Sequence, residues 1–321
     1  MDNYIEPFAG SLACLWARPD DRWQSGAETV NDADSYICNF WRALDADPEQ
    51  VAAYCDWPVN ETDLLARHLW LVNTGRERIA KLEADPDFYD AKVAGWWVWG
   101  INAWIGSGWC SGAGPWKLVD GEVQLPHLGN AGMGVNRQLP HLGNAGRGVN
   151  RKLPHLGNRA PGPDLPMVWQ GDRSLLDYFA ALAARLRRVR VCCGDWSRVV
   201  TDGAMAYGDS VGIFLDPPYL GDVRTKDLYR VDDHSISAAV RDWAIARGDD
   251  RRLRIVLAGY EAEHVMPASW RIHAYSANAS YNTAAGGGDN KANRHNERLW
   301  FSPGCLNQES LPIFRQSLLT T

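Results

Sequence analysis

The chain has 321 residues, of which 45% are apolar and 22% charged, and its formal net charge at pH 7 is −6. These values are ordinary for a globular protein, and the negative charge argues against indiscriminate binding to polyanions. No run of eighteen apolar residues and no basic-then-apolar N-terminus occurs, which predicts a cytoplasmic protein without membrane contact. The length fits one large α/β domain that carries an insertion, or two domains.

The cysteines predict neither a zinc site nor a disulfide framework, because they form an odd set without paired CxxC spacing. They are Cys14, Cys38, Cys55, Cys110, Cys192, Cys193 and Cys305. We expect reduced, mostly buried thiols and no bound metal. The sixteen tryptophans exceed the usual share, and core packing explains most of that excess.

The N-terminal part reads as two strand-turn-helix units. A strand at 4–6 leads into the turn Pro7 to Ser11, and a helical run follows at 12–17. A second strand is predicted at 27–30, followed by a helical pattern at 36–44. Alternation of this kind predicts a parallel sheet.

The middle of the chain has a different character. Apolar residues recur at helical spacing over 62–81 and 88–105. A 14-residue segment then begins at Leu125, recurs at Leu139 and restarts at Leu153, so repeats occupy 125–158. Their glycine and proline content excludes a continuous helix and predicts loops or short strands.

The α/β pattern returns after Pro163. The expected elements are a helix at 175–186, strands at 189–193 and 211–215, a helix at 236–246, a strand at 253–258, and a final strand pair at 270–275 and 298–302. We therefore predict a main domain formed by residues 1–55 and 165–321, interrupted by an insertion at 56–164.

One tetrapeptide stands at a position where α/β proteins do chemistry. Asp216, Pro217, Pro218 and Tyr219 follow the apolar strand 211–215, and open α/β sheets bind ligands at the carboxyl ends of their strands. Two prolines would also serve a rigid turn. The flanking strand favours the functional interpretation.

The order of motifs resembles the Dam-like, alpha-group N6-adenine DNA methyltransferases. The matching residues are Glu6 to Ser11, an acidic turn after the second strand, Gly194-Asp195-Trp196 and Asp216 to Tyr219. The resemblance covers roughly residues 1–45 and 165–305. It implies a Rossmann-like S-adenosylmethionine-dependent methyltransferase sheet, with an inserted helical and repeat-containing target-recognition region, acting on double-stranded DNA.

The catalytic tetrapeptide fits the chemistry that this resemblance implies. An aryl amine is a poor nucleophile because its lone pair is delocalised into the ring. Hydrogen-bond acceptors around the amine draw that pair out, and the expected acceptors are the Asp216 carboxylate and the Pro217 carbonyl. Tyr219 would stack on the flipped adenine.

The resemblance also implies a cofactor site for S-adenosylmethionine. Its residues would be Glu6, Pro7, Phe8, Ala9, Gly10, Ser11, Asp32, Asp195, Trp196 and Asp216. Asp32 would accept the ribose hydroxyls, with helix capping as the alternative and Asp34 as the competing candidate. Asp195 would approach the adenine of the cofactor, or serve a turn. The family's glycine two places after Gly10 is Leu12 here.

Two segments are candidates for DNA contact. Residues 123–163 contain five Lys or Arg and no acid, and Arg137, Arg147, Arg151 and Lys152 are the expected phosphate contacts. A solvated low-complexity loop is the alternative. In the Asn- and Gly-rich stretch 276–298, Asn293 and Arg294 could help to hold the flipped base, or the stretch is a hairpin linker.

Three functions remain open at this stage. Adenine N6 methylation is the first, and cytosine N4 methylation is the second, because the same tetrapeptide could hold either exocyclic amine. A catalytically silent DNA-binding protein of the same fold is the third. The sequence leaves the oligomeric state and the recognition sequence open.

Overall fold

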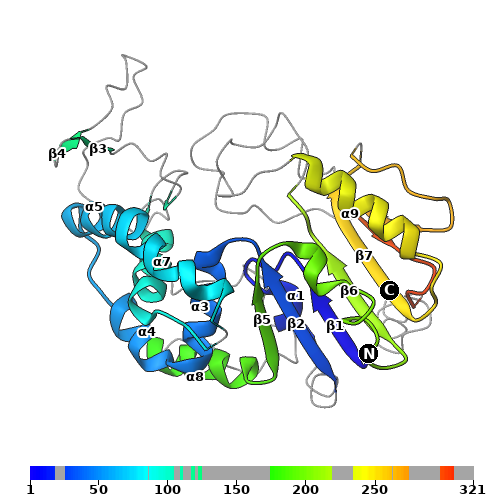
Figure 1. The fold of residues 1–321 in the computed structure, drawn as a ribbon, viewed down its shortest axis with the longest axis horizontal. Helices are drawn as coiled ribbons and strands as arrows, with labels where there is room; N and C mark the ends of the chain where they lie inside the picture. Colours follow the sequence, from blue (N-terminus) through cyan, green and yellow to red (C-terminus); the bar gives the residue numbers. More distant parts are fainter. Residues whose placement is uncertain are drawn as a thin grey trace, which may run out of the picture.

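The computed structural model describes residues 1–18, 26–85, 87–104, 109–110, 117–119, 122–124, 174–218, 234–261, 263–274 and 297–306. It shows an α/β protein built around a seven-stranded mixed sheet (Figure 1). The strands of this sheet are β1 (Asn3–Glu6), β2 (Ala27–Asp32), β5 (Val189–Cys193), β6 (Val211–Leu215), β7 (Leu253–Tyr260), β8 (Arg271–Ala274) and β9 (Glu297–Phe301). Their order is β5-β2-β1-β6-β7-β9-β8, which is compatible with a Rossmann-like fold.

The sheet is mostly, but not wholly, parallel. Strands β5, β2, β1, β6 and β7 are parallel neighbours, as the alternation of strand and helix predicted. The last strand pair, for which the sequence predicted no direction, is different, because β9 runs antiparallel to both β7 and β8. The sequence between β8 and β9 is rich in Asn and Gly and lacks the apolar helical pattern of a parallel crossover.

Helices cover both faces of the sheet. On one face, Tyr4 and Val30 pack against α1 (Ala13–Trp16), α3 (Ser35–Ala46) and α8 (Leu175–Leu186). On the other face, Ile5 and Ile213 pack against α9 (His234–Arg247) and the short η3 turn (Trp196–Val199). Neighbouring residues of β1 thus belong to different cores, as strand geometry requires.

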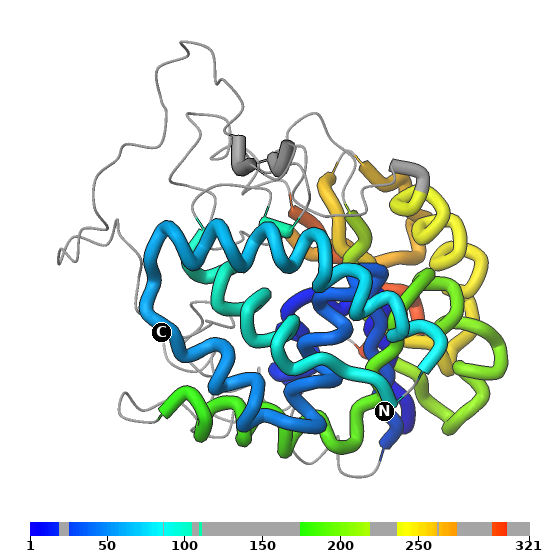
Figure 2. Tube along the Cα trace, turned by 60° about the vertical axis from the view of Figure 1, so that its left-hand side comes forward, coloured from blue at the N-terminus to red at the C-terminus, as the bar shows by residue number. Residues whose placement is uncertain are grey.

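A helical layer extends from α3 on the side away from α9 (Figure 2). It contains α4 (Pro48–Cys55), α5 (Glu61–Trp70), η1 (Leu71–Gly75), α6 (Arg76–Ile79), η2 (Ala80–Glu83) and α7 (Ala91–Ala103). Helix α7 packs on α3 and α4, so its Ala94 and Val98 share a core with the sheet. A short antiparallel pair, β3 (Lys117–Val119) and β4 (Glu122–Gln124), follows this layer. The repeats at 125–158 lie outside the described residues.

The helix expected at 62–81 is confirmed, with a change of helix type inside it. Residues 61–83 are helical throughout, and a π-helical turn, η1, lies between α5 and α6. The hydroxyl of the buried Tyr36 donates a hydrogen bond to the Leu71 carbonyl at 2.6 Å, at the start of that turn. A side chain that enters the backbone ladder in this way is a recognised cause of helix distortion.

Tryptophans of this helical layer pack around the buried side chain of Arg67. The guanidinium of Arg67 lies 4.2 Å from the ring centre of Trp99, 5.0 Å from that of Trp96 and 5.2 Å from that of Trp57. Arg67 is buried, whereas Trp57 is about half exposed. Cation–π contacts of this kind tie α5 to α7.

No helix among the described residues has the length and apolar character needed to cross a membrane.

Candidate active site at the carboxyl edge of the sheet

Four loops meet where the strands β5, β2, β1 and β6 end. These strands are parallel neighbours, so the residues that follow them share one edge of the sheet (Figure 1). The chain runs outward from β1 to β2 and β5, and then crosses back to place β6 on the other side of β1. The reversal between β1 and β6 is the place where open α/β sheets bind ligands.

Neighbouring elements hold the loop after β1 in a fixed shape. Gly10 has a φ of +46°, donates its N–H to the Asp32 carboxylate at 2.9 Å and accepts the Trp41 indole N–H at 3.0 Å. The Ala9 N–H donates to the Asn31 carbonyl at 2.8 Å. A Cβ added at Gly10 would meet no atom within 4 Å among the described residues. The turn thus leaves room for a ligand to approach the backbone.

Leu12 stands in a conformation that suits glycine. Its φ is 59° and its ψ 28°, in the left-handed region, and its side chain is completely buried. At this position the methyltransferases that the sequence resembles have a glycine. The helix expected at 12–17 is reduced to the single turn α1, which begins after this left-handed residue.

Asp32 and Asp34 have separate roles at the end of β2. The Asp34 carboxylate caps α3 by accepting the Tyr36 N–H at 2.8 Å, so helix capping belongs to Asp34. The Asp32 carboxylate instead accepts the N–H groups of Gly10 and of Asp34, at 2.9 and 2.8 Å. Burial raises the pKa of Asp32 to about 6, although both backbone N–H groups stabilise its charged form.

Asn31 is a site residue that the sequence analysis missed. It is buried at 2% exposure, and its amide donates to the Pro7 carbonyl at 3.1 Å and the Gly194 carbonyl at 3.0 Å. One side chain therefore fixes the loops after β1 and β5 to the end of β2. The available signal was a second polar residue beside Asp32 at the end of the strand.

The two acids nearest the strand reversal are Glu6 and Asp216. Glu6 is the last residue of β1, with 2% exposure, and its carboxyl accepts the Tyr4 hydroxyl at 2.9 Å. Asp216 follows the last residue of β6 and is exposed. Burial, together with the nearby Asp216 charge, raises the pKa of Glu6 to about 8.

The loop after β5 contributes a capping acid and an aromatic ring. Asp195 caps η3 by accepting the Ser197 N–H at 2.9 Å, which is the turn role named as its alternative. Trp196 stacks on Phe8 with ring centres 6.2 Å apart and also meets Trp243 of α9. Phe8 and Trp196 therefore pack between the loops and the α9 side of the sheet.

The tetrapeptide Asp216 to Tyr219 is described in part. Asp216 is exposed, Pro217 is buried and Pro218 is intermediate, at the edge that the sequence predicted. Tyr219 lies outside the described residues, as do Arg137, Arg147, Arg151, Lys152, Asn293 and Arg294. The structure thus brings Glu6 to Gly10, Asp32, Asp195 and Asp216 to one edge of the sheet.

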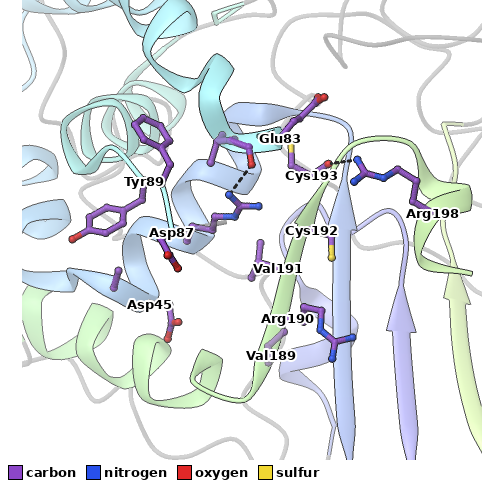
Figure 3. A pocket seen from close by; sticks show the side chains of 14 residues that line it. Asp45, Glu83, Asp87, Tyr89, Val189, Arg190, Val191, Cys192, Cys193 and Arg198 are labelled. Carbon is purple, nitrogen blue, oxygen red and sulfur yellow. Dashed lines mark hydrogen bonds between the residues drawn. The ribbon is translucent and has the colours of Figure 1, made fainter. Parts of the chain in front are cut away.

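A pocket of about 590 Å³ lies elsewhere, along the outer edge of β5 (Figure 3). All five residues of β5 line it, together with polar side chains that include Arg42, Asp45 and Glu83. Arg198, which also lines the pocket, donates a hydrogen bond to the Cys193 carbonyl at 3.1 Å. Neither Glu6, Asp32 nor Asp216 reaches this pocket, so it is distinct from the edge described above.

Within the described ranges, no cluster of three or more His, Cys, Asp or Glu side chains is placed to hold a metal ion. No protein-family model and no curated protein matches the chain.

Proposed function

We propose that this protein is a DNA methyltransferase that transfers a methyl group from S-adenosylmethionine to the N6 amine of a flipped adenine in double-stranded DNA. The observation that carries the proposal is the position of Asp216-Pro217-Pro218. An exposed carboxylate and two prolines stand at the carboxyl end of β6, beside the reversal of strand order and across from the Gly10 turn.

The order of strands supports the same assignment. Numbered along the chain, the strands of the large sheet lie in the order 3-2-1-4-5-7-6, with the seventh reversed. The first five follow the order of dinucleotide-binding sheets.

The residues at the edge suit the proposed cofactor. Open space beside Gly10 would admit the methionine part close to the backbone. The Asp32 carboxylate, held by two backbone N–H groups, would accept the ribose hydroxyls. Asp195 would lie near the adenine ring. When bound, S-adenosylmethionine supplies an electrophilic methyl group on its sulfonium centre.

The protein's contribution to methyl transfer is positioning and electrostatics. The Asp216 carboxylate would accept one N6 hydrogen and the Pro217 carbonyl the other, which raises electron density on the nitrogen. Proline at 217 and 218 restricts the backbone, so these acceptors need little reorganisation. Stacking by Tyr219 would offset part of the few kcal/mol that extrusion of the base costs.

The distribution of charge favours DNA contact outside the helices α4 to α6. Between Asp47 and Lys92, acids outnumber Lys and Arg by ten to five. The segment 123–163 has five Lys or Arg and no acid, and 276–298 carries further basic side chains. Phosphate contacts require such cations, so we assign DNA binding to these two segments.

Nucleoside mass spectrometry tests the function directly. DNA from a methylation-deficient host that expresses the protein should contain N6-methyladenine. Asp216→Ala should reduce that product roughly 100-fold or more, because the acceptor is lost. The matched control is Asp242→Ala, which removes an exposed aspartate of α9 and should leave methylation unchanged.

Other outcomes of this experiment lead to different conclusions. N4-methylcytosine in place of N6-methyladenine would keep the site and overturn the choice of base. Soluble protein with neither product, and without heat of S-adenosylmethionine binding in calorimetry, would favour the silent DNA-binding protein.

A further inference from the structure

Glu6 and Asp216 stand at the carboxyl ends of two neighbouring strands. β1 and β6 are parallel, with Ile5 opposite Ile213, so Glu6 lies level with Phe214 and Asp216 comes two residues further along the chain. Glu6 closes β1 and Asp216 directly follows β6. Glu6 is almost completely buried, whereas Asp216 is exposed.

Among the described residues, Arg18 is a cation near Glu6; its charge lowers the Glu6 pKa, but its ion pair is with Glu28. Arg18 lies with its guanidinium 4.3 Å from the Tyr4 ring centre, and its Nε is 2.8 Å from a carboxylate oxygen of Glu28. Arg185 reaches the same Glu28 carboxylate. The titratable groups around Glu6 are Tyr4 of β1, Cys14 of α1, Arg18 after it, Glu28 and Asp32 on the same face of β2, and Asp216 after β6.

This geometry favours one proton shared unequally by the pair. Two adjacent carboxyl groups resist double ionisation, and a buried carboxylate without its own cation is costly. Glu6 is the more deeply buried of the two acids and loses more hydration as an anion, so the proton belongs on Glu6. Burial and the Asp216 charge raise the pKa of Glu6 to about 8, in agreement with this assignment.

We propose that Glu6 is a positioning residue that must remain protonated for Asp216 to serve as the amine acceptor, so that loss of the Glu6 proton turns methyl transfer off at alkaline pH. The inference rests on the proposed function. An ionised Glu6 would repel Asp216. Glu6 is fixed by β1 and by the Tyr4 hydroxyl, so the exposed Asp216 would turn away from the substrate.

The protonation of Glu6 is testable without any enzymatic activity. Carboxyl ¹³C chemical shifts of the full chain, with Glu6 assigned through Glu6→Gln, should show Glu6 titrating near pH 8. Asp216→Asn should shift that titration to lower pH, because it removes the neighbouring charge. A Glu6 titration near its ordinary value of 4.5 would overturn the proposal.

Unfolding equilibria give a second test that does not need activity. Between about pH 4.5 and pH 8 the unfolded chain releases a proton that the folded chain keeps at Glu6. The Glu6 contribution therefore weakens the folding equilibrium up to about tenfold per pH unit across this window. In urea titrations Glu6→Gln should lack this component, so its stability relative to wild type should improve as pH rises. A constant difference between the two proteins would contradict the assignment.

The activity profile then tests the role. Wild-type methylation should fall about tenfold per pH unit above pH 8, whereas the methylation by Glu6→Gln, taken relative to its own value at pH 7, should not fall through that range, because its amide stays neutral. The matched control is Asp45→Asn, an acid-to-amide change at the end of α3, which should retain the alkaline fall. An alkaline fall that is identical in wild type and Glu6→Gln would overturn the role, as would an inactive but folded Glu6→Gln.

These measurements separate the two proposals. If the wild type methylates no DNA while Glu6 titrates near pH 8, the proposed function fails and the proton assignment stands. If methylation occurs and Glu6 titrates as an ordinary acid, the function stands and the further inference fails.

Discussion

Two buried glutamates on adjacent strands face opposite electrostatic surroundings. Glu28 lies near the start of β2 and Glu6 at the end of β1, on the same face of the sheet, and each is 2% exposed. The Glu28 carboxylate accepts hydrogen bonds from both terminal nitrogens of Arg185, at 2.7 and 2.9 Å, and also contacts Arg18. Glu6 has the Tyr4 hydroxyl and a second acid as neighbours.

The difference separates an acid that holds the fold together from one that belongs to a site. A buried charge is tolerated when cations and hydrogen bonds satisfy it, as they do for Glu28. At the carboxyl edge, Glu6 and Asp32 both have raised pKa values, because burial outweighs the partners they have. Buried acids whose pKa values are shifted in this way are concentrated where proteins bind ligands or carry out chemistry.

The largest expected effect comes from removing an arginine that neutralises the buried Glu28 carboxylate. Arg185→Ala removes the bidentate partner of Glu28 and leaves that carboxylate with Arg18 alone. We expect a loss of about 3–5 kcal/mol in the free energy of unfolding, measured by urea denaturation. Methylation per folded molecule should be unchanged.

Arg190→Ala is the matched control, since Arg190 is exposed on β5 and should change stability by about 0.5 kcal/mol or less. A loss below about 1 kcal/mol for Arg185→Ala would mean that the Glu28 cluster does not hold the fold together.

An intermediate effect is expected at Asp32, where the comparison predicts that the affinity for the cofactor depends on pH. Acceptance of the ribose hydroxyls needs the charged carboxylate, and its pKa is about 6. The affinity for S-adenosylmethionine should therefore be constant above pH 7 and fall about tenfold per pH unit well below pH 6. Calorimetry between pH 5 and pH 8 measures this dependence.

Asp32→Asn should bind weakly and without that pH dependence. The neighbouring Asp34→Asn is its control, because asparagine caps a helix as well as aspartate does. Weakened binding in Asp34→Asn, with normal binding in Asp32→Asn, would move the ribose contact to Asp34.

The smallest effect is a difference in stability between two variants of Leu12, which reports on the backbone of the loop after β1. Both Leu12→Ala and Leu12→Gly empty a fully buried position and should cost roughly 2–5 kcal/mol. Glycine is normally the less stable of the two by up to about 1 kcal/mol. At a φ of 59° the order should reverse, because alanine keeps a left-handed penalty of roughly 1–2 kcal/mol.

Urea titration of both Leu12 variants measures this difference. A glycine variant clearly less stable than the alanine variant would show that Leu12 is not strained. The reversed order would explain how a leucine is tolerated in a left-handed conformation, since its buried packing compensates the conformational cost.

Local patterns predicted most of the sheet and part of the site. The strand 211–215 is confirmed at both ends as β6, and 189–193 as β5, because short apolar runs bounded by Gly, Asp or Ser leave little choice of register. The same reasoning placed Asp216 at a strand end and Gly10 in a tight turn. It predicted the helix at 62–81 but not the π-helical turn at 71–75, where the Tyr36 hydroxyl donates to the Leu71 carbonyl.

The sequence by itself determined the element types, the acidic residues at the strand ends and the motif order, since these follow from apolar periodicity and turn residues. Only the tertiary structure decided how those acids differ. Asp32 and Asp34 are two residues apart, yet one joins the Gly10 turn and the other caps α3. Glu6 and Glu28 are the same residue type at equal burial, and only one meets arginines. The charge of a buried acid depends on groups brought to it from distant parts of the chain, which the spacing of residues in the sequence does not record.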